Sequence, residues 1–322
     1  MQKTRHPLRG YLLIAAATLF WGGSATLGKA AFTGLFGAEA KPIDSLALAQ
    51  ARTTISLLIL LPLVLFWKGS AGLRLPRRDA FLCVLLGVLG LAPSNFFYYY
   101  AIEKTSVATA IILQYVAPIW VLLYMVFRGF QRATALRVLA VLLAFVGSVM
   151  AIGVVATKLD APYLTIVGLK LHWGGVIAAE LAGISFAFYN IVGGVLVERH
   201  DRWKILVYAL ASVALFWMFV NPPWKIYAAH YSGGQWLFLT IFSITSMLLP
   251  FSCYFAGLQY LDPTRAIVTS CLEPVFAILF AATFVHEAVG WVQAVGIMIV
   301  LAATILVQMP DKVVPAHAAE HV

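Results

Sequence analysis

Runs of apolar residues, each about 20 residues long and separated by short polar stretches, make up most of this chain. An α-helix needs a run of that length to cross the hydrocarbon of a bilayer. The pattern predicts ten membrane-spanning helices, over residues 10–30, 44–67, 79–100, 105–127, 134–155, 174–197, 203–222, 235–258, 264–285 and 288–308. Because the connecting stretches are short, we expect an all-α integral membrane protein folded as one compact bundle.

The composition agrees with a membrane protein. Hydrophobic residues make up 62% of the chain and charged residues 11%, with a mean hydropathy of +0.92, whereas soluble domains carry about a quarter charged residues. The three cysteines, Cys83, Cys253 and Cys271, all fall within predicted spans, which argues against a disulfide framework. No metal-ligand spacing, nucleotide-binding GxxxxGK[ST] loop or Ser/His/Asp set occurs, so we predict no metal, no cofactor and no enzymatic activity.

The net charge of +9 has a membrane explanation. If the N-terminus is cytoplasmic, most Lys and Arg residues fall in cytoplasmic segments, including Arg77, Arg78, Arg199 and Arg202. With an even number of spans, both termini then face the cytoplasm. The first apolar run is too long for a signal peptide and is predicted to be the first helix. We therefore expect a lipid partner and no nucleic acid.

The two halves of the chain resemble each other. An offset of 156 residues places Pro118 on Pro274 and carries residues 98–103 onto residues 254–259. The repeats are predicted to cover residues 1–157 and 158–322, with five spans each. An odd number of spans inverts the second copy, and inverted repeats are a transporter architecture with a substrate site at their interface. The expected fold is therefore two inverted five-helix repeats around a central cavity.

Prolines interrupt two matching spans. Each proline removes a backbone donor and frees the carbonyl four residues earlier, which belongs to Gln114 before Pro118 and to Ser270 before Pro274. Broken helices at matching positions in two repeats indicate a binding site, with the prolines as hinges. The alternative is a packed kink, because proline is frequent in membrane helices.

Glu273, immediately before Pro274, places a carboxylate in the middle of a span, where a charge costs roughly 2.5–3.5 kcal/mol on insertion scales. It should face the interior. One interpretation is a structural ion pair with Arg52 of the second span. The others are proton carriage or contact with a substrate amine. Glu180 is a second candidate acid.

Several uncharged residues are further candidates for the cavity wall. The aromatic candidates are Trp21, Tyr115, Trp120 and Tyr189, and the amide candidates are Asn95 and Asn190. The alternative for each is a contact or hydrogen bond between helices. Tyr99, Tyr100, Trp67 and Trp224 are predicted to face lipid or the membrane interface.

These features together resemble the drug/metabolite transporter superfamily, specifically its EamA-type members. The resemblance covers almost the whole chain and is carried by Leu19-Phe20-Trp21-Gly22-Gly23, by Arg52, and by the motifs ending in Pro118 and in Leu272-Glu273-Pro274. It implies a ten-helix bundle with a central cavity and, in many members, export of amino acids or other small metabolites. Ala117 departs from the pattern, because an acid often stands at that position.

The sequence therefore predicts a secondary active transporter that exports a small metabolite, with amino acids first, by alternating access across the cytoplasmic (inner) membrane of a bacterium. A proton is the candidate coupling ion, and the protein is expected to be a monomer or homodimer. The alternatives are an uptake or exchange carrier for another metabolite, a lipid flippase, and a ligand-gated sensor or channel.

Overall fold

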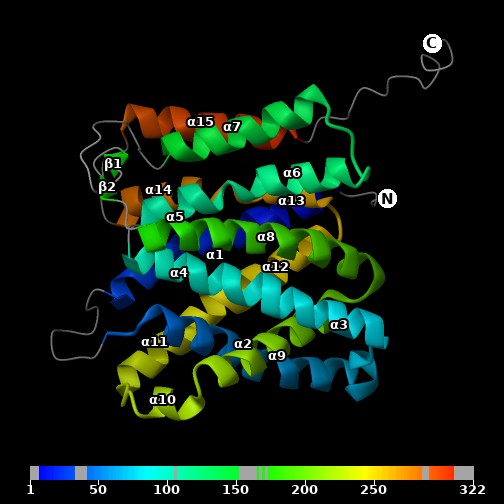
Figure 1. The fold of residues 1–322 in the computed structure, drawn as a ribbon, viewed down its shortest axis with the longest axis vertical. Coiled ribbons are helices and arrows are strands. Elements are labelled where there is room, and N and C mark those ends of the chain that lie inside the picture. Colours follow the sequence, from blue (N-terminus) through cyan, green and yellow to red (C-terminus); the bar gives the residue numbers. More distant parts are fainter. Residues whose placement is uncertain are drawn as a thin grey trace.

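Long helices lie side by side and run along one common direction (Figure 1). The computed structural model describes residues 7–32, 42–104, 107–151, 165–166, 169–170, 173–284 and 290–307. Within these ranges the regular structure is helical, apart from one short antiparallel pair of strands, β1 (Thr165–Ile166) and β2 (Leu169–Lys170). In that pair Thr165 lies opposite Lys170, and Ile166 opposite Leu169. Residues 152–155, the end of the predicted span 134–155, lie outside the described residues.

The helices of the first half follow the predicted segments. They are α1 (Pro7–Phe32), α2 (Ser45–Lys68), a 3₁₀ turn (Ser70–Leu73), α3 (Arg77–Leu85), a π-helical turn (Leu86–Leu91), α4 (Ala92–Lys104), α5 (Val107–Gln114), α6 (Ala117–Phe127) and α7 (Ala135–Ala151). The π-helical turn joins α3 and α4 into one continuous span.

The second half contains the same kinds of element in a similar order. They are α8 (Trp173–Arg199), α9 (Arg202–Val220), the short α10 (Pro223–Tyr227), α11 (Gly233–Ser243), a π-helical turn (Ile244–Leu248), α12 (Leu249–Leu258), α13 (Pro263–Ser270), α14 (Glu273–Phe284) and α15 (Trp291–Leu306). The sequence pattern did not indicate α10, the 3₁₀ turn or the π-helical turns, because each is short and set by local contacts.

Six helical stretches of the described residues are long and apolar enough to cross a membrane: Pro7–Lys29, Ser45–Lys68, Arg77–Lys104, Gly174–Arg199, Arg202–Val220 and Gly233–Leu258. Shorter apolar helices cover Ala117–Phe127, Ala135–Met150 and Ala294–Leu306. The chain is thus a predominantly helical, multi-pass membrane protein. Each of the ten predicted segments is mostly helical where it is described, with breaks at 115–116 and 271–272, and a crossing by all ten remains a prediction.

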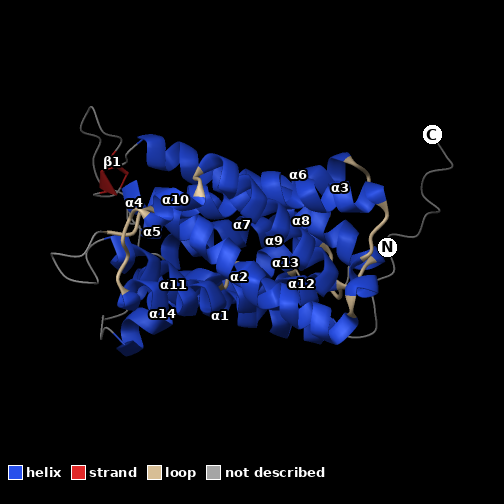
Figure 2. Ribbon diagram, turned by 90° about the horizontal axis from the view of Figure 1, so that it is seen from below, coloured by secondary structure: helices blue, strands red, loops and turns tan. Residues whose placement is uncertain are grey.

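Helices from the two halves pack against each other in the interior. The helix α1 lies against α12 and α14, α4 lies against α8, and α2 lies against α9. The pair α7 and α15 forms a separate layer at one edge of the bundle (Figure 1). A view from below shows the same common helix direction (Figure 2). The cores of the two halves are therefore shared.

The outer surface of the bundle is apolar. Phe66, Phe127 and Phe219 are 87%, 89% and 86% exposed, and many leucine and isoleucine side chains lie on the same outer surface. A protein in water rarely exposes large contiguous apolar patches, whereas lipid chains solvate such side chains. The surface therefore fits the hydrocarbon core of a bilayer.

The helix breaks occur at matching positions. In the first half α5 ends at Gln114 and α6 begins at Ala117; in the second, α13 ends at Ser270 and α14 begins at Glu273. These boundaries differ by the same 156 residues as the sequence repeat. Each proline lies at the second position of its new helix, where the missing N–H has no intrahelical partner to lose. The spans are therefore divided into half-helices rather than bent at an interior proline.

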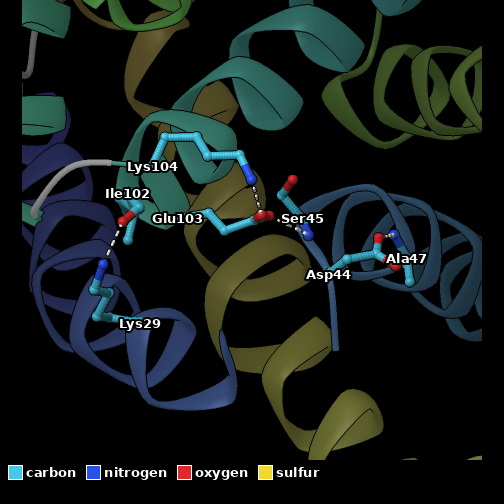
Figure 3. A network of polar contacts seen from close by, with 7 residues as sticks. All are labelled: Lys29, Asp44, Ser45, Ala47, Ile102, Glu103 and Lys104. Carbon is cyan, nitrogen blue, oxygen red and sulfur yellow. Dashed lines mark hydrogen bonds and ion pairs between the residues drawn. The ribbon is translucent and has the colours of Figure 1, made fainter. Parts of the chain in front are cut away.

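A polar cluster ties three helices together at one end of the bundle (Figure 3). The Lys29 Nζ donates to the carbonyl of Ile102 at 2.7 Å, which joins α1 to α4. The Glu103 carboxylate accepts from the backbone N–H of Ser45 at 3.0 Å and pairs with Lys104 at 2.8 Å. Because Ser45 begins α2, these contacts fix the starting end of α2 against the last turn of α4.

A second polar cluster lies at the opposite end of α2. Lys68 pairs with Asp201 at 2.6 Å, and Asp79 contacts His200 at 2.7 Å. Burial raises the pKa of Asp201, but Lys68 and two backbone N–H groups outweigh that effect and hold the pKa below its usual value. These contacts join α2, α3 and the α8–α9 connection, so polar interactions tie helices together at both ends of α2.

Candidate functional site

A small cavity lies between the two halves, with a volume of about 40 Å³. Its polar lining consists of Ser24, Arg52, Ser94, Asn95, Gln114 and Glu273. Its aromatic lining consists of Trp21, Tyr98, Tyr99, Tyr115, Phe186 and Phe251. These residues come from α1, α2, α4, α5, α8, α12 and α14 and from the break after α5. Both halves thus contribute to one polar and aromatic chamber.

Glu273 is the first residue of α14 and is 7% exposed. Its two carboxylate oxygens accept hydrogen bonds from different tyrosines, Oε1 from the Tyr98 hydroxyl and Oε2 from the Tyr115 hydroxyl, each at 3.0 Å. The position at the start of a helix favours a negative charge, because the unpaired N–H groups and the helix dipole are positive there. The N-terminus of the half-helix α14 therefore stabilises the negative charge of the Glu273 carboxylate.

The helix break that precedes Glu273 is satisfied by a side chain from the other half. The carbonyl of Ser270, which loses its intrahelical donor to Pro274, accepts a hydrogen bond from the Tyr115 hydroxyl at 2.7 Å, so the single hydroxyl proton of Tyr115 is shared between this carbonyl and the Glu273 carboxylate. A buried carbonyl without a partner would destabilise the protein. Tyr115 itself sits in the matching break of the first half, directly after α5. The two interruptions thus contact each other.

Arg52 lines the same cavity from α2 and is 2% exposed. Its Nη2 donates to the carbonyl of Ser246 in the π-helical turn at 2.6 Å. The guanidinium carbon lies 4.6 Å from the ring centre of Tyr99 and 5.4 Å from that of Phe242. The Nε and Nη1 atoms have no hydrogen-bond partner in the described part of the chain. The structure therefore holds Arg52 by a carbonyl and two rings, and an ion pair with Glu273 is not formed.

An aromatic cluster adjoins the cavity on the side of α8 and α12. The ring centres of Trp21 and Tyr254 are 5.2 Å apart, and the Tyr254 hydroxyl donates to Asn190 Oδ1 at 2.5 Å. Tyr189 stacks on Phe186 at 6.0 Å. Tyr189 and Asn190 are completely buried behind the cavity wall. They support the lining residues and do not themselves line the chamber.

The sequence matches the EamA-like transporter family over residues 8–153 and 173–309. The chain belongs to this family.

Individual relatives agree with the membership. An uncharacterized transporter of Archaeoglobus fulgidus is 26% identical over 225 residues, which cover 68% of this chain and 75% of the relative. The uncharacterized inner membrane transporter YicL of Salmonella typhimurium is 22% identical over 308 residues, which cover 94% of this chain and 96% of the relative. A solved crystal structure shares the fold, with a TM-score of 0.69 at 20% identity, over 93% of this chain and 96% of the other.

The EamA-like fold brings six of the residues singled out from the sequence to the cavity: Trp21, Arg52, Asn95, Gln114, Tyr115 and Glu273. Ser270 lies one contact away, through Tyr115. Trp120 is 43% exposed, on the outer surface of α6, and Glu180 is half-buried on α8 away from the lining. Pro118 and Pro274 begin the half-helices that meet beside the cavity.

Sequence reasoning missed six lining residues of this EamA-like transporter, and Tyr98 and Tyr99 are the two that contact its charged groups; the others are Ser24, Ser94, Phe186 and Phe251. Tyr99 was expected to face lipid or the interface and is instead 2% exposed against Arg52. Tyr98 was not considered, although it bonds to Glu273. One signal was available: Asn95 lies three residues before Tyr98 and four before Tyr99, so one helix face carries an amide and two hydroxyls.

Proposed function

We propose that this protein is a secondary active transporter that exports a small metabolite, with amino acids as the first candidates, by alternating access across the cytoplasmic membrane of a bacterium. The observation that carries the proposal is Glu273 at the start of the half-helix α14, in a cavity lined by both halves. Transporters place substrate and coupling-ion sites at such interrupted helices. Glu273 is then the group that contacts a substrate amine or carries a proton.

The size of the cavity supports a mechanism in which the helices around it move during transport. A volume of about 40 Å³ admits about two or three water molecules and is too small for a metabolite. Polar clusters also hold helices of the bundle together at both ends of α2. We infer that this conformation is a contracted state and that helices of the two halves separate, on one side and then the other, to admit and release the solute.

The matching half-helices support an inverted-repeat architecture for this motion. In this proposal residues 1–157 and 158–322 form two five-span repeats, and the breaks before Pro118 and Pro274 act as hinges. The distribution of basic residues favours a cytoplasmic position for both termini. Transport by each chain uses its own cavity, in a monomer or a homodimer.

The test is a flux measurement on purified protein. A thermal-shift screen of the full chain against a metabolite library containing the twenty amino acids identifies binders, because a ligand that binds only the folded state raises its stability. Each binder is then tested for saturable counterflow in proteoliposomes. The Glu273→Gln variant should lose flux or its response to a pH gradient. The control, Glu198→Gln, changes an exposed acid at the end of α8 and should transport normally.

The outcomes separate the alternatives. Saturable counterflow that depends on Glu273 supports the proposal. Ion flux without saturation would indicate a channel, and movement of labelled lipid between leaflets would indicate a flippase. Either result in the absence of counterflow would refute a metabolite carrier.

A further inference from the structure

Arg52 is a buried cation with unused hydrogen-bonding capacity that faces the cavity. A guanidinium has five N–H donors, and the structure shows one of them donating, from Nη2 to the carbonyl of Ser246. The Nε and Nη1 atoms are buried and have no hydrogen-bond partner among the described residues. Buried charged groups are normally paired and fully hydrogen-bonded, because desolvation is otherwise too unfavourable. The described residues therefore supply no acceptor for these two atoms.

The neighbours of Arg52 do not neutralise it. The rings of Tyr99 and Phe242 contribute cation–π attraction, and the Ser246 carbonyl contributes a dipole. None of the three carries a formal negative charge. Glu273, the acid of the cavity, is already held by Tyr98 and Tyr115. A solute anion would complete the coordination of the guanidinium.

The charges of the residues that line the cavity indicate which kind of anion Arg52 would bind. Among the residues that line the cavity, the charged side chains are Arg52 and Glu273. One cation and one acid disfavour a phosphate ester or a dicarboxylate, which would leave excess negative charge beside Glu273. A guanidinium matches the planar, two-oxygen geometry of a single carboxylate. A solute that also carries an ammonium group would satisfy Glu273 as well.

We propose that Arg52 is the subsite for the carboxylate of the transported solute, so that the solute is an α-amino acid bound as a zwitterion between Arg52 and Glu273. This inference rests on the proposed transport function. It assigns Arg52 a direct contact with the solute, in place of the structural ion pair that the sequence alone left open. It also explains why the guanidinium is held by a carbonyl and rings, which leave Nε and Nη1 without an acceptor among the described residues.

Matched ligands that differ only in the carboxylate test this subsite. The probes are alanine, leucine and phenylalanine together with their amides, which keep the side chain and the amine. Binding to the purified full-length protein is measured by thermal shift and by titration at millimolar concentrations. At least one amino acid should bind, and its amide should bind about tenfold to a hundredfold more weakly, as expected for the loss of hydrogen bonds to a charged group.

Variants of Arg52 test whether this residue is the cause of the preference for the amino acid over its amide. In Arg52→Gln and Arg52→Lys the preference for the acid over its amide should fall to within a few-fold. The control is Arg202→Gln, because Arg202 lies outside the cavity, donates to Gln259 at 3.1 Å and stacks on Trp203; its preference should equal that of the wild type. If the Arg52 variants do not fold, the wild-type comparison decides. Equal binding of acid and amide, or no binding of any of the three acids, would overturn the subsite.

The same measurements distinguish this inference from the proposed function. Acid-selective binding without counterflow in proteoliposomes would leave the subsite standing and refute transport. Counterflow of a solute that lacks a carboxylate, at the wild-type rate in Arg52→Gln, would leave transport standing and refute the subsite.

Discussion

Replacing Glu273 by glutamine tests what holds this buried side chain in place. The carboxylate accepts one hydrogen bond from Tyr98 and one from Tyr115, each at 3.0 Å. Glutamine has the same shape, and its Oε1 can still accept from one hydroxyl while its Nε2 donates to the other. Tyr115 can keep its proton on the Ser270 carbonyl, which lies 2.7 Å away. Every partner can therefore remain hydrogen-bonded in the variant.

The energy of the change follows from these contacts. Hydrogen bonds to a charged group contribute about 1.5–3 kcal/mol and neutral ones about 0.5–1.5 kcal/mol. The observed 3.0 Å is longer than the roughly 2.5–2.7 Å of strong hydroxyl–carboxylate bonds, so the loss is about 1 kcal/mol per bond. Burying an amide is less unfavourable than burying a carboxylate, which offsets this loss. The free energy of unfolding should change by less than about 2 kcal/mol.

A double-mutant cycle with Tyr98→Phe measures the hydrogen bond directly. In the wild-type background Tyr98→Phe should lower the free energy of unfolding by about 1.5 kcal/mol, near the upper limit for interhelical hydrogen bonds in membranes. In the Glu273→Gln background it should lower it by about 0.5 kcal/mol, as for a neutral bond. The coupling energy is then about 1 kcal/mol. Unfolding in mixed micelles with increasing SDS, followed by tryptophan fluorescence, provides the four values.

Two results would refute this reasoning. A loss of more than about 3 kcal/mol in Glu273→Gln, rescued by Arg52→Gln, would show an ion pair between these residues. A coupling energy of zero with Tyr98→Phe would show that the hydroxyl does not bind the carboxylate in the membrane protein. A stable Glu273→Gln protein that no longer transports would support the functional role.

Three further perturbations test the architecture. In Gly22→Ala the new Cβ would lie 2.9 Å from two backbone atoms of α14, so α1 and α14 must separate; thermal unfolding should show a loss of about 1–3 kcal/mol, whereas the control Gly23→Ala, with 3.5 Å to a phenylalanine ring, should be nearly neutral. Pro118→Ala and Pro274→Ala should preserve stability within about 1 kcal/mol and slow flux, and wild-type flux in both would show that the breaks are not hinges. The pKa of Asp201 is held below its usual value, so its ion pair should stabilise the protein at neutral pH by less than about 1 kcal/mol, and this increment should vanish as the pH falls through the lowered pKa; a stability–pH curve identical to that of Asp201→Asn would contradict this.

The positions of the helices could be predicted from the sequence because the requirement is local. In a bilayer every backbone N–H and C=O must find a partner, and a helix satisfies them within its own segment. Apolar runs therefore mark helices without knowledge of their neighbours. Pro118 and Pro274 lie at helix breaks, with the half-helices beginning at Ala117 and Glu273, one residue before each proline, whereas Pro62 lies inside the continuous helix α2.

The partners of the buried polar groups could not be predicted in this way. Glu273 and Arg52 were both recognised as costly charges inside the membrane, and opposite charge suggested that they pair. The structure gives each a different partner: Glu273 binds Tyr98, which is 175 residues away in the chain, and Arg52 binds the carbonyl of Ser246, which is 194 residues away. Such contacts depend on the rotation and depth of each helix in the bundle.

The adjacent residues Tyr98 and Tyr99 illustrate the difference. The sequence by itself determined that both lie on a membrane-spanning helix with Asn95 at helical spacing, but consecutive residues on an α-helix point about 100° apart. The packing of α4 directs the Tyr98 hydroxyl to Glu273 and the Tyr99 ring to Arg52. Hydrophobicity is a property of each segment and fixes where the chain is helical, whereas the charges of the cavity are compensated by distant segments, so their partners were decided only by the tertiary structure.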